Sequence, residues 1–256
     1  MRRRSSLAIP ALLILSTSVA PAQGREREGG REANYAANNV PYDGRFTFAR
    51  IRFNTAGSGG PFWRQDLKWD HDYPRGERNL MRILSEITAL RPYMDGGNIF
   101  TLDDPELTRY PVAYLCEPGF WTLNDKESEG LRNYLLKGGF LIVDDFVDDQ
   151  WINFEEQMRR VLPQGRLVRL DASHPIFDSF FHIQSLEFTH PNWGHAAEFY
   201  GIFEDNDPKK RLMVIVNYNN DIGDYWEWSD AGFFPVQLSN EAYKLGVNYI
   251  VYGMTR

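Results

Sequence analysis

The sequence has very little cysteine: Cys116 is the single cysteine among 256 residues. One thiol excludes an internal disulfide, so the stability of the folded chain must come from its hydrophobic core. It also excludes zinc sites built from several thiolates. The neighbours Leu115, Glu117 and Pro118 lack the glycines that a sharp turn around a nucleophile needs. We therefore interpret Cys116 as a buried structural thiol.

Long hydrophobic runs and basic surfaces are also lacking. After residue 22 no stretch approaches the roughly 18 apolar residues that a transmembrane helix needs. The formal net charge is −7, and loss of Arg2, Arg3 and Arg4 with a leader takes it to −10. An acidic chain without a basic stripe repels phosphate backbones and anionic lipids. The sequence therefore predicts no nucleic-acid partner and no membrane span after cleavage.

The histidines show no metal-binding motif. The five histidines lack the His-Glu-x-x-His and His-x-His spacings that place two imidazoles at one site. We therefore assign no metal ligand, and the sequence names no cofactor.

The first 22 residues have the three parts of a signal peptide. Three arginines precede a short apolar stretch, Leu7 to Val19, and Ala20-Pro21-Ala22 supplies the small residues of a cleavage site. We expect cleavage after Ala22 and a periplasmic or secreted location, with the general secretory and twin-arginine routes both open. Residues 23–44 are rich in glycine, asparagine and charge, which indicates a flexible linker. Residues 45–256 form the predicted folded domain.

The remaining pattern alternates strands and helices. We expect helices over residues 76–90, from Asn124 or Asp125 to Gly138, over 154–162 and near 240–252. Strands are expected over residues 46–53, 98–102, 111–116, 140–143, 166–170 and 212–216. The apolar run Phe140–Val143 is typical of a strand that is buried on both faces of a parallel sheet. The order predicts a three-layer α/β/α sandwich with a mostly parallel sheet.

Ligands of such sheets bind beyond the carboxyl ends of the strands, which selects candidate residues by position. The pocket candidates are Glu117, Asp144, Asp145, His174 and Asp221. Adjacent carboxylates on an extended backbone point to opposite faces, so we expect one of Asp144 and Asp145 to face the pocket, as a cation ligand or general base. The alternative is a helix cap for one and solvation for the other.

Tryptophans in predicted loops raise a carbohydrate-binding alternative. Exposed aromatic rings stack on sugar faces, whereas loop tryptophans can also pack onto the core as lids. The loop tryptophans are Trp63, Trp69, Trp121, Trp193, Trp226 and Trp228.

Residues from Phe46 to Thr255 resemble the DUF4159 family. The resemblance rests on Phe48-Ala49-Arg50 with Trp63, Asp72-Tyr73-Pro74, Asn79-Leu80, Tyr110-Pro111, Leu131-Arg132, Tyr134-Leu135, Gly138-Gly139-Phe140, Asp144-Asp145, His174-Pro175-Ile176, Arg211-Leu212 and Leu245-Gly246-Val247-Asn248. It implies a flavodoxin-like fold of the class I glutamine amidotransferase type, distantly similar to ThuA-like proteins. Where amidotransferases keep their nucleophilic cysteine, this chain has Asp144-Asp145, which argues against glutaminase activity.

Three functions follow as hypotheses. The first is an exported non-catalytic domain that binds a carbohydrate or an envelope protein. The second is a hydrolase, with or without a metal, that uses strand-end carboxylates and a histidine. The third is a structural assembly domain. The residues leave the substrate, the oligomeric state and the existence of a reaction open.

Overall fold

The computed structural model describes residues 39–55 and 66–256. The predicted signal peptide, most of the predicted linker, and Trp63 lie outside the described residues, so these expectations stay predictions. Within the described ranges, the helices fall short of the length and apolar character that crossing a membrane requires.

The fold is built around a mixed sheet of seven strands in the order β3-β1-β4-β6-β9-β8-β7. Its strands are β1 (Phe48–Ile51), β3 (Gly97–Phe100), β4 (Val112–Cys116), β6 (Phe140–Asp144), β7 (Val168–Arg169), β8 (Glu198–Phe203) and β9 (Leu212–Tyr218). The pairs from β3 through β9 are parallel, whereas β8 and β7 add antiparallel strands at one side. A separate antiparallel pair joins β2 (Asn54–Thr55) to β5 (Trp121–Thr122). The predicted mostly parallel sheet is confirmed.

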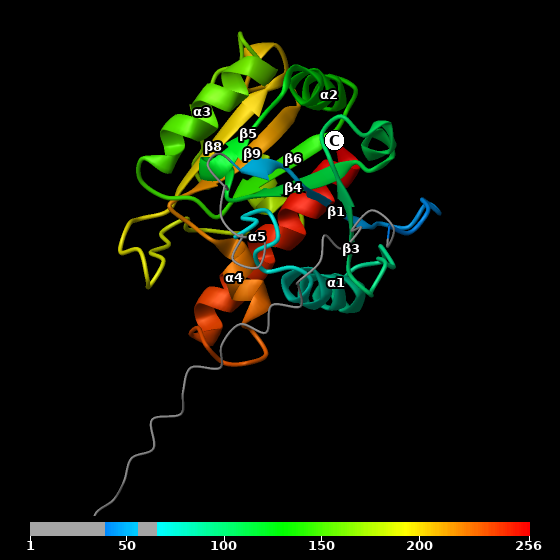
Figure 1. The fold of residues 1–256 in the computed structure, drawn as a ribbon. Coiled ribbons are helices and arrows are strands. Elements are labelled where there is room, and N and C mark those ends of the chain that lie inside the picture. The colour runs from blue at the N-terminus through cyan, green and yellow to red at the C-terminus, as the bar shows by residue number, and fades with distance from the viewer. Residues whose placement is uncertain (1–38, 56–65) are drawn as a thin grey trace, which may run out of the picture. The chain divides into compact units, whose positions relative to one another are not determined.

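Helices cover both faces of the seven-stranded sheet (Figure 1). One hydrophobic core receives side chains of α1 (Arg75–Ile87), α4 (Ile222–Glu227) and α5 (Val236–Thr255). The other core receives those of α2 (Asp125–Leu136) and α3 (Gln150–Val161). Along β6, Ile142 faces the first core and Val143 the second, as expected for a parallel strand that is buried on both faces. The predicted three-layer α/β arrangement is confirmed.

Short 3-10 helices fill several connections between these elements. They are η3 (Pro105–Arg109), η4 (Pro118–Phe120), η5 (Pro175–Asp178) and η6 (Glu204–Asn206). Of these, η4 directly follows the carboxyl end of β4, and η5 begins after His174. The two connections therefore fix the backbone next to two of the predicted pocket residues.

The start of α2 shows how the sequence sets a boundary locally. The Asn124 side chain accepts a hydrogen bond from the Glu127 N–H at 3.0 Å, and the Glu127 carboxylate accepts one from the Asn124 N–H at 2.8 Å. This reciprocal pair is a capping box, which satisfies two N–H groups that the helix leaves unpaired. The predicted cap at Asn124 is confirmed.

The strand β8 is a feature that the sequence pattern did not predict. Gly201 lies in the middle of this strand, and a Cβ there would stand 2.4 Å from Cδ1 of Leu212. The glycine therefore permits close packing, yet in a sequence a glycine looks like an interruption of a strand. The other antiparallel strand, β7, was expected over residues 166–170, and the structure gives it as Val168–Arg169.

The strand order creates a switch point between β1 and β4. The chain adds β3 on one side of β1 and then β4 on the other side. Loops that leave two strands at such a point diverge, and ligands of open α/β sheets bind there, beyond the carboxyl ends. The segments that follow β1 and β4 therefore mark this edge of the sheet as the place for a site.

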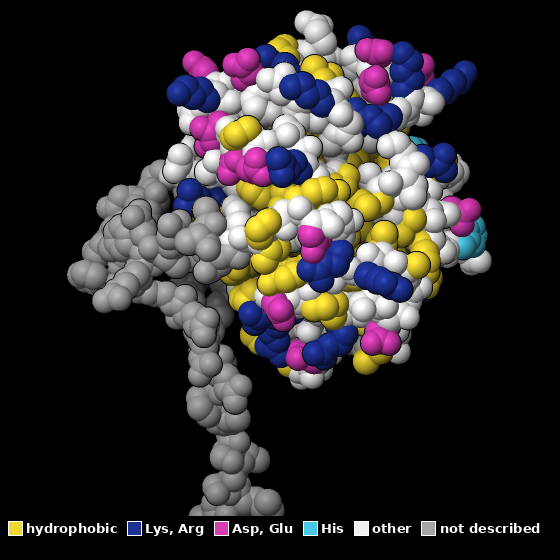
Figure 2. All heavy atoms as spheres, turned by 90° about the vertical axis from the view of Figure 1, so that its right-hand side faces the viewer, with side chains coloured by type: hydrophobic (Ala, Val, Ile, Leu, Met, Phe, Trp, Pro, Cys, Tyr) yellow, Lys and Arg dark blue, Asp and Glu magenta, His cyan; other side chains and the backbone are white. Residues whose placement is uncertain are grey.

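One face of the molecule, shown in Figure 2, carries lysine, arginine, aspartate and glutamate side chains interspersed among hydrophobic ones. This mixture agrees with the composition of the sequence, in which 35 acidic residues outnumber 28 basic ones.

Candidate functional site

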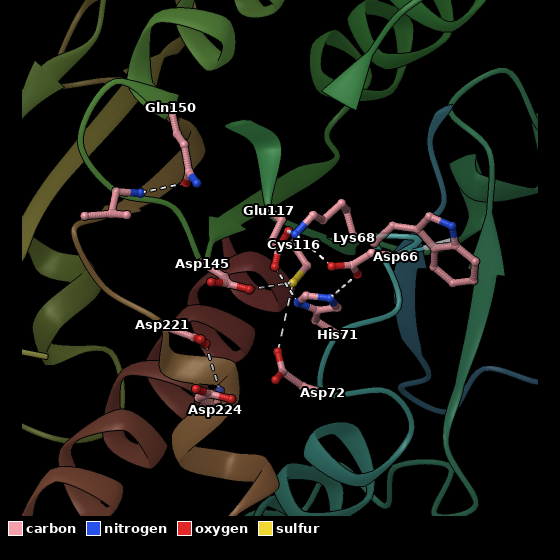
Figure 3. A network of polar contacts seen from close by, with 12 residues as sticks. Asp66, Lys68, His71, Asp72, Cys116, Glu117, Asp145, Gln150, Asp221 and Asp224 are labelled. Carbon is pink, nitrogen blue, oxygen red and sulfur yellow. Dashed lines mark hydrogen bonds and ion pairs between the residues drawn. The ribbon is translucent and has the colours of Figure 1, made fainter. Parts of the chain in front are cut away.

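Acidic side chains from several strand ends gather at the carboxyl edge of the sheet (Figure 3). Glu117 follows β4, Asp144 ends β6, Asp145 comes next, and Asp221 follows β9. The loop that precedes α1 adds His71 and Asp72 to the same region. The structure thus brings together four of the five predicted pocket residues.

Asp145 lies at the centre of the cluster because its backbone breaks the strand. Its φ is +63°, a left-handed conformation, and its N–H donates to the carbonyl of Asn220 at 3.1 Å. The expectation of opposite directions for Asp144 and Asp145 assumed an extended backbone, and the turn at Asp145 removes that assumption. The Sγ of Cys116 lies 3.4 Å from the Asp145 carboxylate and 4.0 Å from that of Asp72.

Left-handed backbone recurs around the cluster. Lys68, Asp72 and Glu117 have φ values of +62°, +64° and +45°. Side chains other than glycine pay roughly 1 kcal/mol or more for this conformation, and it persists where surrounding structure enforces it. Residues in such conformations concentrate at functional sites. The backbone conformation and the charge of these residues therefore both mark this edge of the sheet as a candidate functional site.

Asp144 anchors the start of α4. Its carboxylate accepts hydrogen bonds from the Tyr114 hydroxyl at 2.8 Å, from the Ile222 N–H at 3.0 Å and from the Gly223 N–H at 3.1 Å. A Cβ at Gly223 would lie 2.4 Å from Oδ2 of Asp72, so only glycine allows this approach. Asp144 therefore has a structural role that holds α4 against the acidic cluster.

His71 connects Glu117 of the acidic cluster to Asp66 in the loop before α1. Its Nε2 lies 2.6 Å from Oδ1 of Asp66, and its Nδ1 contacts Oε1 of Glu117. The ammonium group of Lys68 lies 3.0 Å from Glu117 and 3.1 Å from Asp66. Burial lowers the pKa of His71, but its hydrogen bonds to Glu117 and Asp66 outweigh burial and raise the pKa overall.

Burial dominates the electrostatics of the acidic cluster. It raises the pKa of Asp145 to about 8, with a further rise from the charges of Glu117 and Asp144. Burial raises the pKa of Asp144 to about 7 against its hydrogen bonds, which lower it. The pKa values of Asp72 and Asp221 are also raised well above the usual range, first by burial and then by neighbouring carboxylates. Without a further cation, these carboxyl groups therefore keep their protons to a higher pH than ordinary carboxyl groups do.

Arg50 does not supply the missing positive charge. Its guanidinium is buried, pairs with the carboxylate of Glu77 and donates to the carbonyl of Trp69 at 2.8 Å. It also lies over the ring of Tyr114, 5.0 Å from the centroid. Glu77 is therefore the main counter-charge of Arg50, and the guanidinium lowers the pKa of Asp72 less than burial raises it.

The donor atoms of the cluster fit a metal ion. One donor atom from each of His71, Glu117 and Asp145 lies within 4.8 Å of the others. Asp72, Cys116 and Asp145 form a second such group, which shares Asp145. Imidazole nitrogen and carboxylate oxygen together suit zinc and related divalent ions. Burial, together with the charges of Asp145 and Asp72, raises the pKa of the Cys116 thiol, which keeps it protonated in the metal-free site.

The structure does not bring His174 into this cluster. Its Nδ1 accepts from the Ile176 N–H at 3.2 Å and so caps η5. Its ring packs against Phe203 and Tyr252, near the beginnings of β9 and β6. His174 therefore lies at the opposite edge of the parallel strands, because the turn that carries it leads away from the carboxyl ends.

The predicted loop tryptophans mostly pack as lids on the core. Trp69, Trp121 and Trp226 are buried, and Trp193 and Trp228 are half-buried. A hollow of about 470 Å³ elsewhere on the surface includes Trp151 and Tyr200 among its lining residues, but none of the predicted pocket residues. The arrangement removes the main support for sugar stacking at the five described positions.

Sequence reasoning missed the contributions of His71 and Asp72 and the nearby carboxylate of Asp224, which raises the pKa of Asp72. The rule of strand ends applies to β1 as well, but His71 comes far after Ile51 in the sequence. Without the fold, that distance hid the fact that residues 66–73 return to the carboxyl edge. Asp224 lies inside the short helix α4, where an acidic residue is ordinary.

The fold and the site define an α/β protein with a buried, histidine-containing acidic site at the switch point of its sheet. Residues 47–254 match the model of the family described as domain of unknown function (DUF4159), so the chain belongs to this family. The resemblance expected from the sequence is confirmed at the level of the family, and the amidotransferase-like fold stays an expectation. None of the curated proteins matches the chain.

Proposed function

We propose that the protein is an exported, metal-assisted hydrolase that binds a divalent cation through His71, Glu117 and Asp145. The observation that supports this most directly is the presence of one donor atom from each side chain within 4.8 Å of the others. Export is proposed from the predicted signal peptide. The hydrolase function follows the second hypothesis from the sequence, in which carboxylates at strand ends act with a histidine.

The electrostatics of the site favour a cation. Asp145, Asp72 and Asp221 are buried and repel one another as carboxylates. A divalent ion neutralises two such charges and favours their ionised forms. In its absence Lys68 and a protonated His71 occupy the oxygens of Glu117 and Asp66. Cation binding then displaces a proton from His71, so affinity rises with pH.

Asp66 has a defined part in this proposal. Its carboxylate pairs with Nε2 of His71, while Nδ1 faces Glu117. Nδ1 is therefore the ligand nitrogen, and Asp66 holds the tautomer and the orientation of the ring, as carboxylates commonly do for ligating histidines.

Asp72 is positioned to take a proton during hydrolysis. A divalent ion held by His71, Glu117 and Asp145 would supply Lewis-acid chemistry, which lowers the pKa of water toward neutral. Asp72 lies beside Asp145, since the Sγ of Cys116 contacts both carboxylates. The raised pKa of Asp72, due first to its burial, suits a general base.

Calorimetric titration of the metal-stripped protein with Zn²⁺ and Mn²⁺ tests the binding. We expect Glu117→Gln and Asp145→Asn to weaken affinity by about 100-fold or more, because each removes a ligand. Asp205→Asn is the matched control for Asp145→Asn, because Asp205 also has a positive φ of +54° but is exposed.

Hydrolysis is tested separately with p-nitrophenyl acetate and bis(p-nitrophenyl) phosphate. The proposal expects turnover that EDTA abolishes, that added cation restores and that Asp72→Asn reduces without loss of the bound ion. Equal affinity in the wild type and Glu117→Gln rejects the cation site. Turnover that persists in EDTA rejects the metal-assisted reaction.

A further inference from the structure

His190 is a buried histidine whose ring nitrogens have no hydrogen-bond partner in the described part of the chain. The residue is only 1% exposed, and both Nδ1 and Nε2 are buried. A buried polar group without a partner is unfavourable, so its presence needs an explanation.

The surroundings of His190 fix its ring without using its nitrogens. The carbonyl of His190 accepts hydrogen bonds from the N–H groups of Trp193 at 3.1 Å and Gly194 at 3.0 Å, which close a turn. The ring packs against Trp193, Tyr225 and Phe234 at centroid distances of 4.6, 5.4 and 5.7 Å. Phenylalanine or leucine would fill this aromatic enclosure at no polar cost, so packing alone does not account for an imidazole.

Two carboxylates lie next to the imidazole. One donor atom each from His190, Asp221 and Asp224 lies within 4.8 Å of the others. Asp221 uses one oxygen to accept from the Asp224 N–H at 2.8 Å and keeps the other for a further partner. Asp221 is buried, whereas Asp224 is half-buried and leaves one side open. The neighbouring Asn220 is fully buried, and both polar atoms of its side chain also lack a hydrogen-bond partner among the described residues.

We infer that His190, Asp221 and Asp224 bind a divalent cation of the zinc or cobalt class. The unpartnered imidazole of His190 supplies the nitrogen ligand, and the two carboxylates supply the charge. Three protein ligands leave a fourth position of a tetrahedral ion open, which is the arrangement of catalytic rather than structural zinc sites.

This cation is additional to the one proposed at His71, Glu117 and Asp145. Asp221 and Asp224 come from the segment after β9, and they lie at the same edge of the sheet as Asp145 (Figure 3). The inference does not require the first cation, because the two groups share no ligand.

Cobalt titration of the metal-stripped protein tests the inference through stoichiometry and visible absorbance. We expect about two Co²⁺ per chain in the wild type, with the d–d absorption of a tetrahedral ion. His190→Phe keeps an aromatic ring in the enclosure and removes both nitrogens, so we expect a folded variant that binds about one Co²⁺. Asp224→Asn gives a second route to the same loss, and His182→Phe is a control at an exposed histidine.

The outcomes separate this inference from the proposed function. One ion lost in His190→Phe and the other in Glu117→Gln supports both sites. Binding in His190→Phe and Asp224→Asn equal to the wild type overturns the inference, even if Glu117→Gln loses an ion. A single ion that His190→Phe loses and Glu117→Gln retains supports the inference and rejects the first site.

Discussion

The substitution Asp145→Asn is expected to change how the stability of the metal-free protein depends on pH. The pKa of Asp145 is raised to about 8 in the folded state by burial and by the charges of Glu117 and Asp144, compared with an ordinary value of 3.8. Between these two values the folded state binds more protons than the unfolded state. Its free energy of unfolding therefore falls as the pH rises through this window.

The size of the effect follows from the titration. One carboxylate changes the free energy of unfolding by at most about 1.4 kcal/mol per pH unit. From about pH 5 to about pH 7, the wild type should therefore lose about 3 kcal/mol through Asp145. This loss corresponds to roughly 6–12 °C in the melting temperature for a domain of this size. Asparagine does not titrate, so the variant should lose less stability over the same interval.

Urea denaturation in EDTA, repeated at several pH values, measures the difference directly. The control is Asp205→Asn, whose exposed carboxylate pairs with Lys210 at 2.6 Å. Its curve should run parallel to that of the wild type. Parallel curves for the wild type and Asp145→Asn would refute the reasoning, since they would mean that the buried carboxylate does not resist ionisation.

Three further predictions concern groups around the site. Glu77→Gln should destabilise the protein by about 3–5 kcal/mol in urea denaturation, because it leaves the buried guanidinium of Arg50 without a counter-charge; a loss below about 1 kcal/mol would contradict this. Cys116 is fully buried and its pKa is raised, so at pH 8 its thiol should react with a disulfide reagent no faster than the surrounding structure unfolds locally. A fast reaction in the native protein would count against its burial. His174→Ala should lower stability by about 1 kcal/mol through loss of the η5 cap and leave cation affinity unchanged; weakened binding in calorimetry would return His174 to the site.

Much of the fold was readable from local signals. The capping box at Asn124, the buried run at Phe140–Val143 and the periodic side chains of α1 each depend on residues close in sequence. β8 was not predicted because the glycine in its middle, Gly201, looks in the sequence like an interruption of a strand. In the fold this glycine leaves room for the side chain of Leu212, which begins β9.

The sequence predicted the location of the site, at the carboxyl edge of the sheet, but it did not predict which side chains contact one another there. Glu117, Asp145 and Asp221 follow strands directly, so the rule of strand ends finds them. The direction of Asp145 depends on a left-handed backbone that the pattern of a strand does not reveal. His71 and His190 reach the cluster from long connections, and only the folded chain shows what they approach.

Anomalous diffraction at the zinc edge, from crystals of the protein grown with Zn²⁺, tests the central claim most directly. The account predicts an anomalous peak within about 2.0–2.2 Å of a nitrogen of His71 and of carboxylate oxygens of Glu117 and Asp145. Crystals that show Lys68 and His71 still paired with Glu117, and no anomalous peak among these side chains, would contradict it.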